Sequence, residues 1–196
     1  MKYFKLSAVL KGHSSDVGCF LCYFTTDKFK VRGTLLPDPS LAITASRDGS
    51  SRIWKRTAPS PPTYDPAELS HSATFKTCVA YASEVKGFPE GLVFIGDQTG
   101  IIEARRPETT SERNADALMI GHANHVSSLD VNLQAGYLVS GSWDHAALVW
   151  RLGEFEPKLQ LQGHTAAVWA VLAYDDDNIV TGNGSLFEIF TSTNCP

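Results

Sequence analysis

GHANHVSSLDVNLQAGYLVSGSWDHAALVW, residues 121–150, decides the fold of this chain of 196 residues. The stretch opens with a Gly-His pair and continues as short apolar segments separated by turn residues. Val126, Leu129 and Val131 indicate a first strand, and YLVSGS and AALVW indicate two more on either side of a turn at Trp143 and Asp144. Short strands with this spacing are typical of an antiparallel sheet. The stretch therefore predicts one antiparallel repeat unit.

Polar residues of the same stretch have a spacing with a physical use. Asp144 lies 22 residues after His122 and six before Trp150. In a four-stranded unit this spacing lets the imidazole, the hydroxyl of Ser142, the turn carboxylate and the indole N–H form one buried string of hydrogen bonds. Each buried polar group then has a partner, so these residues are predicted to be structural.

The unit recurs along the chain. Gly163-His164 begins LQGHTAAVWAV, 42 residues after the first Gly-His pair, and Gly12-His13 opens an upstream unit that ends in ITASRDGSSRIW. The predicted hydrogen-bonded sets are His13, Ser46, Asp48 and Trp54, and His122, Ser142, Asp144 and Trp150. Serine, histidine and aspartate could also suggest a hydrolase triad. A catalytic site has no need to recur, so we expect no catalytic residues and no enzyme.

With SGSWD and VW in the places of the signature dipeptide and its strand, the chain resembles the WD-repeat family of β-propellers. The resemblance implies an all-β propeller with about four blades in an open or incomplete ring, where the full propeller of the family has seven. The expected parts are blade 1 at about 11–57, a linker at 58–70, a degenerate blade 2 at about 71–106, blade 3 at about 121–152 and an incomplete blade 4 at about 163–190.

Blade 2 lacks most of the signature. Ser70-His71 stands in place of the Gly-His pair, Asp97 lies near the turn, and Glu103 occupies the position of the tryptophan. We therefore expect this blade to be held mainly by burial of apolar side chains. The expected core residues are Val79, Leu92, Val93, Phe94, Ile101 and Ile102.

The segment 18–31, GCFLCYFTTDKFKV, lengthens blade 1 beyond the repeat. His13 and Asp48 are 35 residues apart, and removing 18–31 restores a spacing of 21. We interpret the segment as an insertion, such as a retained intron translated in frame; the alternative is a genuine long loop. An intron would be missing from the mature transcript, whereas a loop would be encoded in every transcript.

Blade 4 departs from the repeat after Gly182. The repeat predicts Ser-x-Asp and a tryptophan six residues later, but the chain continues as NGSLFEIFTSTNCP. We interpret residues 183–196 as the result of a frame change or a premature end, and the alternative is a naturally divergent last blade.

Composition argues against several classes of partner. The formal net charge is −4, so no basic field supports a nucleic-acid partner. No apolar signal region follows Met1 and no run approaches 18 apolar residues, so we expect no membrane partner and a location in cytoplasm and nucleus. The scattered cysteines, Cys19, Cys22, Cys78 and Cys195, are expected to be reduced thiols. Cys19 and Cys22 form only half of a zinc motif, so neither a metal nor a cofactor is expected.

Four runs are more specific than the general repeat: YFKLSAVLKGHSSDV, ASRDGSSRIW, SGSWDHAALVW and LQGHTAAVWAV. They resemble the N-terminal propeller of the phospholipase A-2-activating protein family, the ubiquitin-homeostasis WD-repeat proteins. The resemblance covers most of residues 3–182 and implies binding of ubiquitin or ubiquitylated proteins. It also implies that other domains of full-length members bind the valosin-containing protein, an AAA ATPase. The expected function is that of a ubiquitin-binding module in ubiquitin homeostasis and proteasomal degradation.

A propeller presents to partners the loops before its first strands and the turns after its second strands. By position in the repeat, the expected rim residues are Asp16, Arg47, His125, Trp143, Thr165 and Trp169. Exposed tryptophan and arginine are enriched in interface hot spots. For the two tryptophans, ordinary packing across a blade is the alternative. Two other readings of the chain remain open, namely a protein-interaction scaffold without ubiquitin binding and an incomplete product without a function of its own.

Overall fold

Fifteen antiparallel strands build four successive sheets in a computed structural model that describes residues 10–22, 41–59, 62–108 and 114–192. In every sheet, strands that follow one another in the chain lie side by side. The prediction of an all-β fold with about four blades is confirmed. No helix capable of crossing a membrane is found among the described residues.

Blades 1 to 3 have four strands each, and blade 4 has three described strands. Blade 1 contains β1 (Val17–Cys22), β2 (Leu41–Ser46), β3 (Ser50–Pro59) and β4 (Pro62–His71). Blade 2 contains β5 (Lys76–Ala82), β6 (Leu92–Asp97), β7 (Ile101–Arg105) and β8 (Ala117–Ile120). Blade 3 contains β9 (Val126–Asn132), β10 (Tyr137–Ser142), β11 (Ala147–Arg151) and β12 (Pro157–Leu161). Blade 4 contains β13 (Ala170–Ala173), β14 (Asn178–Gly182) and β15 (Phe187–Thr191).

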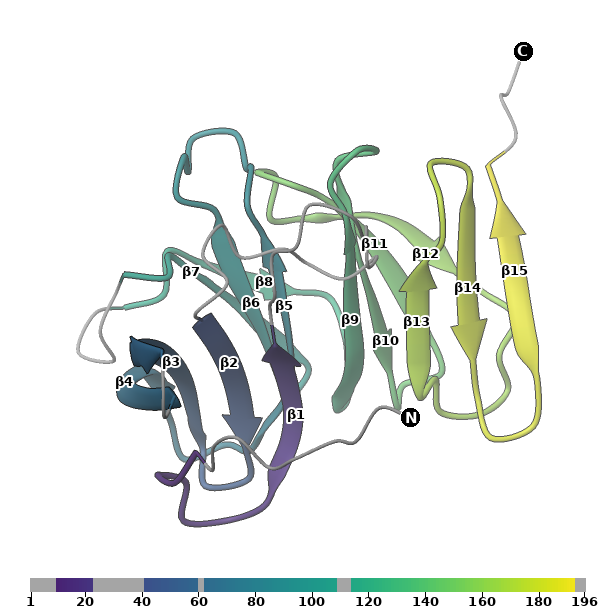
Figure 1. The fold of residues 1–196 in the computed structure, drawn as a ribbon. Helices are drawn as coiled ribbons and strands as arrows, with labels where there is room; N and C mark the ends of the chain where they lie inside the picture. The colour runs from purple at the N-terminus through teal and green to yellow at the C-terminus, as the bar shows by residue number, and fades with distance from the viewer. Residues whose placement is uncertain (1–9, 23–40, 60–61, 109–113, 193–196) are drawn as a thin grey trace, which may run out of the picture.

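The sheets stand next to one another in chain order, and the first strand of each contacts the first strand of the next (Figure 1). This arrangement follows from the sequence, because both faces of an inner sheet are covered and its middle strand is a continuous apolar run. The strand β6, LVFIGD, is buried along its whole length. A strand covered on both faces needs no alternation of apolar and polar residues.

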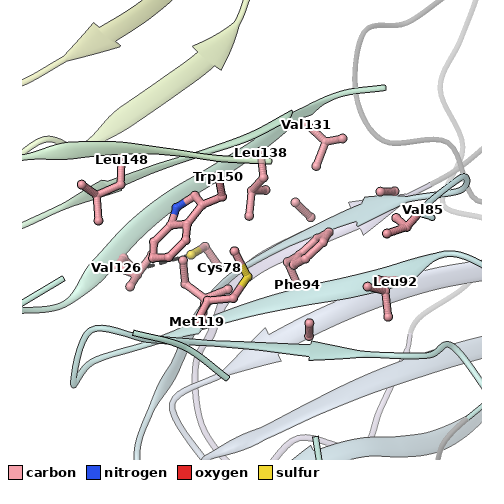
Figure 2. Packing of buried hydrophobic residues seen from close by; sticks show 14 residues of the cluster. Cys78, Val85, Leu92, Phe94, Met119, Val126, Val131, Leu138, Leu148 and Trp150 are labelled. Atoms are coloured by element: carbon pink, nitrogen blue, oxygen red, sulfur yellow. Dashed lines mark hydrogen bonds between the residues drawn. The ribbon is translucent and has the colours of Figure 1, made fainter. Parts of the chain in front are cut away.

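Apolar side chains fill the spaces between neighbouring blades. The largest cluster joins blades 2 and 3, where Trp150 and Leu138 face Phe94 and Met119 (Figure 2). A second cluster joins blades 1 and 2 through residues such as Ile43, and a third joins blades 3 and 4. The expected core of blade 2 is confirmed with one difference, since Ile101 is only partly buried.

The segment 18–31 is divided by the structure. Residues 18–22 belong to β1, whose backbone pairs with β2, and residues 23–31 lie outside the described residues. Removing 18–31 would therefore remove most of β1, and the residues from Arg32 onward would have to replace it. An insertion at 18–31 remains a prediction for the transcript to test.

Residues after Gly182 also take part in the fold. Phe187–Thr191 form β15, which pairs with all of β14. Among the cysteines, Cys78 is buried, and its thiol donates to the carbonyl of Val126. The backbones of Cys19 and Cys22 pair with Ala45 and Ala42, and Cys195 lies outside the described residues.

Candidate functional site

The predicted string of hydrogen bonds is present in blade 3, with one correction. The His122 Nδ1 atom lies 2.9 Å from Asp144 Oδ2, and its Nε2 atom lies 2.7 Å from the hydroxyl of Ser140. The indole N–H of Trp150 donates to the same hydroxyl over 2.8 Å. The string runs through Ser140 and not, as the spacing predicts, through Ser142. The hydroxyl of Ser142 donates to the carbonyl of Asn124 and belongs to the turn.

Blade 1 repeats the arrangement and the correction. Thr44 contacts His13 Nε2 at 2.6 Å and accepts from the Trp54 indole at 2.9 Å. Ser46, the predicted member, instead donates to the carbonyl of Asp16. The physical reason is the same in both blades. Residues two apart on a strand face the same side, and the imidazole reaches the one nearer the middle of the sheet.

The electrostatics of the string suit a structural role. Burial lowers the pKa of His122, and the nearby Asp144 carboxylate offsets this only in part. Burial raises the pKa of Asp144, but hydrogen bonds from the N–H groups of Ala123 and Ala146 and from His122 outweigh it, so that pKa lies below its usual value. The string therefore holds a neutral imidazole and an ionised carboxylate. Because the His122 side chain is fully buried and both its nitrogens are engaged, it cannot reach a substrate.

Blade 2 aligns differently from the sequence prediction. In blade 2 the backbone of Lys76 pairs with that of Asp97, and in blade 3 the first residue of the first strand, Val126, pairs with Ser142 in the same way. Asp97 therefore takes the place of Ser142, and Arg105, not Glu103, takes the place of Trp150. In blade 2 the position of the repeat histidine is occupied by Ser72. A Cβ atom on Gly49 of blade 1 would lie 2.0 Å from the carbonyl oxygen of Ser72, and one on Gly100 of blade 2 would lie 2.5 Å from the carbonyl oxygen of His122 in the same way. His71 is exposed, and its Nδ1 atom lies 3.3 Å from Oε2 of Glu68.

A charged cluster replaces the string in blade 2. The Nζ atom of Lys76 lies 2.6 Å from Glu103 Oε1, and the Nε atom of Arg105 lies 2.8 Å from Glu103 Oε2. Ser70 of blade 1 donates to the same carboxylate. Burial raises the pKa of Glu103, but Lys76, Arg105 and Ser70 outweigh it, so the carboxylate stays ionised. The sequence analysis missed this cluster because no repeated motif links Lys76 to Glu103 and Arg105.

Blade 4 retains half of a string. His164 Nε2 lies 2.6 Å from the hydroxyl of Thr181, and the side-chain amide of Asn183 lies 3.2 Å from His164 Nδ1. Asn183 thus stands in for the missing aspartate. The backbone of Phe190 pairs with Ile179 in blade 4 as that of Trp150 pairs with Leu138 in blade 3. Phe190 therefore occupies the tryptophan position, but its side chain has no N–H group to donate.

Three of the predicted rim residues form one aromatic cluster, which we call the rim cluster: His125, Trp143 and Trp169. The imidazole of His125 stacks on Trp143 with ring centroids 4.5 Å apart, and Trp169 meets Trp143 edge-on at 5.1 Å. A backbone hydrogen bond from Trp143 N–H to the His125 carbonyl sets the stacked pair. The side chains of Trp143 and Trp169 remain 38% and 54% exposed. The rim cluster therefore presents aromatic surface from blades 3 and 4.

The other three predicted rim residues are polar. Asp16 and Arg47 are largely exposed and lie 3.6 Å apart, and Thr165 is exposed ahead of β13. Burial lowers the pKa of His125, the charge of Arg47 lowers it further, and Asp97 opposes both. These charges show that groups of blades 1 and 2 lie close enough to act on the rim cluster. Five of the six predicted rim residues fall into two groups, the rim cluster and the pair of Asp16 and Arg47, and Thr165 is exposed apart from both.

Comparison with known proteins places this geometry in a family. The family model "WD domain, G-beta repeat" matches residues 4–55 and 116–151. The chain is 32% identical over 173 residues to the phospholipase A-2-activating protein of Xenopus laevis and 29% identical over 156 residues to the ubiquitin homeostasis protein lub1 of Schizosaccharomyces pombe. The crystal structure of the WD40 propeller domain of Doa1 superposes with a TM-score of 0.78 at 26% identity, over 97% of this chain and 56% of that one. The chain belongs to the WD-repeat β-propellers of the phospholipase A-2-activating protein family.

This WD-repeat chain spans a small part of its relatives. The matches cover 86% and 79% of the chain but only 19% and 18% of the two proteins. Its four blades correspond to just over half of the Doa1 propeller domain. The activities and partners of the whole relatives are therefore matters for proposal.

The WD-repeat register reveals a rim residue that the sequence analysis missed. Gln98 N–H donates to the Phe75 carbonyl as Trp143 N–H donates to that of His125 and Arg47 N–H to that of Asp16. Phe75 therefore occupies the rim position of blade 2, and its side chain is 45% exposed. An alignment of blade 2 on Asp97 as the position of Ser142 would have found it.

Proposed function

We propose that this WD-repeat chain binds ubiquitin through the rim cluster of His125, Trp143 and Trp169. The observation that carries the proposal is two tryptophans in ring contact that remain exposed, although their surface could have been buried between blades. Aromatic residues at the centre of a patch with polar residues around it are typical of protein interfaces. Asp16, Arg47 and Thr165 supply polar groups on the same rim.

The apolar face of ubiquitin, small and weakly charged, suits such a surface. The names of relatives support this partner, since one of them is a ubiquitin homeostasis protein. The proposal extends to the pathway, which is ubiquitin homeostasis and ubiquitin-dependent degradation, and to the cytoplasm and nucleus as its location. The valosin-containing protein is proposed as a partner of other parts of the relatives and not of these blades.

The test is an NMR titration of isotope-labelled ubiquitin with the purified chain. We expect saturable shifts confined to the apolar face of ubiquitin. Trp143→Ala and Trp169→Ala should each weaken binding by at least about tenfold, the size of a hot-spot truncation. Leu159→Ala is the matched control, because Leu159 is as exposed as Trp169 but lies on the outer strand β12.

Thermal unfolding separates binding from folding in the same variants. Because Trp143 is partly exposed, its truncation should lower the melting temperature by only a few degrees. Unchanged affinity in both tryptophan variants would contradict the proposal. A loss of affinity matched by a large loss of stability would show that Trp143 is a packing residue, and the function would then be that of a scaffold for other proteins.

A further inference from the structure

The outer edge of blade 2 differs from the outer edges of blades 1 and 3. The outer strand of blade 1, β4, contains two prolines and two acidic residues, and that of blade 3, β12, begins with Pro157 and Lys158. Prolines and charges at a sheet edge discourage pairing with another chain. The outer strand of blade 2, β8, has the sequence ALMI and contains neither. No described strand pairs with its outer side.

Two residues of β8 are apolar where the other blades have polar ones. Leu118 occupies the position of Gln160 in blade 3 and of Glu68 in blade 1, since each pairs with the equivalent residue of the third strand. Ile120 directly precedes the Gly-His pair that follows it, as Gln162 does one repeat later. The repeat therefore forms with polar residues at both positions, and packing of the blades does not account for Leu118 and Ile120.

The side chains of Leu118 and Ile120 share one face of β8 and are open to solvent. They are 53% and 67% exposed, whereas Met119 between them is buried in the cluster with blade 3. Alternate residues of a strand face the same side. Both side chains therefore face blade 1, whose Ser70 reaches Glu103 opposite Leu118. Blade 2 has a neighbouring blade on either side, so this edge is the same however many blades the array contains.

The size and chemistry of this edge fit a short extended peptide. A free strand edge offers a row of backbone N–H and C=O groups, with which an added strand can pair. A stable dimer buries about 800 Å² on each copy, whereas even an aromatic side chain buries only about 150–250 Å². Two exposed aliphatic side chains on a strand of four residues are therefore too small a surface for a second copy of this chain.

We propose that an extended segment of another protein adds to β8 as a fifth strand of blade 2. Its paired residues are uncharged, include no proline, and place β-branched or aromatic side chains at two alternate positions beside Leu118 and Ile120. Affinity comes from backbone hydrogen bonds along β8, and selectivity comes from the two side chains. The rim cluster belongs to blades 3 and 4, so this inference is independent of ubiquitin binding.

The experiment selects a display library of random seven-residue peptides on the purified full chain and, separately, on the double variant with Leu118→Gln and Ile120→Gln. Blade 3 has glutamine at both positions, so the double variant should fold, and thermal unfolding checks that it does. We expect the parent chain to enrich uncharged peptides with β-branched or aromatic residues two apart. The double variant should enrich none of them.

Fluorescence anisotropy of a labelled, enriched peptide then measures its affinity. Each single glutamine variant should weaken binding by at least about tenfold, the change expected when one aliphatic side chain is no longer buried. Leu159→Gln is the matched control, because Leu159 is as exposed as Leu118 but lies on β12, and it should leave the affinity unchanged.

A second measurement needs no variant of the chain. Methylating the backbone nitrogen of the peptide, one residue at a time, should weaken binding at every second residue, because an added strand turns alternate N–H groups toward its neighbour. No enrichment on the parent chain would overturn the proposal, and so would peptides that bind the double variant equally well. A parent chain that is dimeric by light scattering and monomeric after Ile120→Gln would show that a second copy occupies the edge instead.

Discussion

Blades 2 and 3 are neighbours with the same strand order and the same register, yet their buried polar groups differ. Blade 3 has the neutral string of His122, Ser140 and Trp150 with the carboxylate of Asp144 at its end. Blade 2 has Glu103 between Lys76 and Arg105 at the corresponding place. One backbone geometry thus accepts two solutions to the same problem, which is to give every buried polar group a partner.

The two arrangements should differ in how much stability the protein loses when one member is removed. A string of neutral hydrogen bonds loses about one kcal/mol for each bond removed. A charged cluster loses more when it is broken, because one charge is left buried without its partner. The Lys76 side chain is fully buried, so it depends on Glu103 more than any exposed lysine would.

The largest effect is expected for Glu103→Ala. The free energy of unfolding should fall by about 3–5 kcal/mol, since the variant leaves the buried ammonium of Lys76 without its carboxylate. Urea unfolding measures the change. The control is the triple variant with Lys76→Met, Glu103→Leu and Arg105→Met, which removes all three charges and should lose much less. A triple variant less stable than Glu103→Ala would contradict this account of the cluster.

The next effect separates Ser140 from Ser142. Ser140→Ala removes the partner of both His122 and Trp150 and should cost about 2–3 kcal/mol. Ser142→Ala removes two partly buried hydrogen bonds of the turn, neither of which belongs to the string, and should cost less, about 1 kcal/mol. Chemical denaturation of the pair decides. A larger loss for Ser142→Ala would restore the string that the sequence predicts.

A smaller effect concerns pH. The pKa of His122 is lowered in the folded chain, so the unfolded chain binds more protons as the pH falls through about 6.5, and the free energy of unfolding then decreases. The slope is at most about 1.4 kcal/mol per pH unit. The lowered pKa values of Asp144 and Glu103 act only near pH 4 and below. His122→Gln should reduce the slope between pH 7 and 5, which urea unfolding at several pH values measures.

The smallest effect is a gain. Phe190→Trp places an indole in blade 4 where Trp150 stands in blade 3, with Thr181 in the place of Ser140. One new hydrogen bond should raise the free energy of unfolding by about 0.5–1.5 kcal/mol in urea. Phe190→Leu serves as the control without a donor. If the tryptophan variant is no more stable than the parent, the two sheets differ in spacing at this place.

The repeat spacing predicted the sheets and most of the polar residues, because Gly-His pairs 42 residues apart and the Asp and Trp offsets are visible in a single sequence. It also predicted that His125, Trp143 and Trp169 lie at the surface, although their ring contacts needed coordinates. The register of blade 2 was wrong by two residues. Asp97 resembles the turn aspartate of the other blades but takes the position of Ser142.

Two features were beyond sequence reasoning for physical reasons. Spacing along a strand cannot tell Ser140 from Ser142, since both face the same side and only the reach of the imidazole chooses. The cluster joins Lys76 on β5 to Glu103 and Arg105 on β7 without any motif that recurs in the other blades, and each residue alone reads as an ordinary surface charge. Such a cluster becomes visible only when the strands are placed.

The turn between the second and third strands of a blade contains one position that restricts which residue the sequence can place there. Gly49, Gly100 and His145 occupy the same place in blades 1 to 3, all with positive φ. A side chain on Gly49 or Gly100 would run into the backbone of the following blade, at 2.0 Å and 2.5 Å from a carbonyl oxygen, whereas blade 3 accepts the side chain of His145. A larger side chain at this turn position should therefore be tolerated at the junction of blades 3 and 4 and destabilising at the two earlier junctions. Tolerance to substitution at this one position thus depends on how closely the two blades of each junction pack.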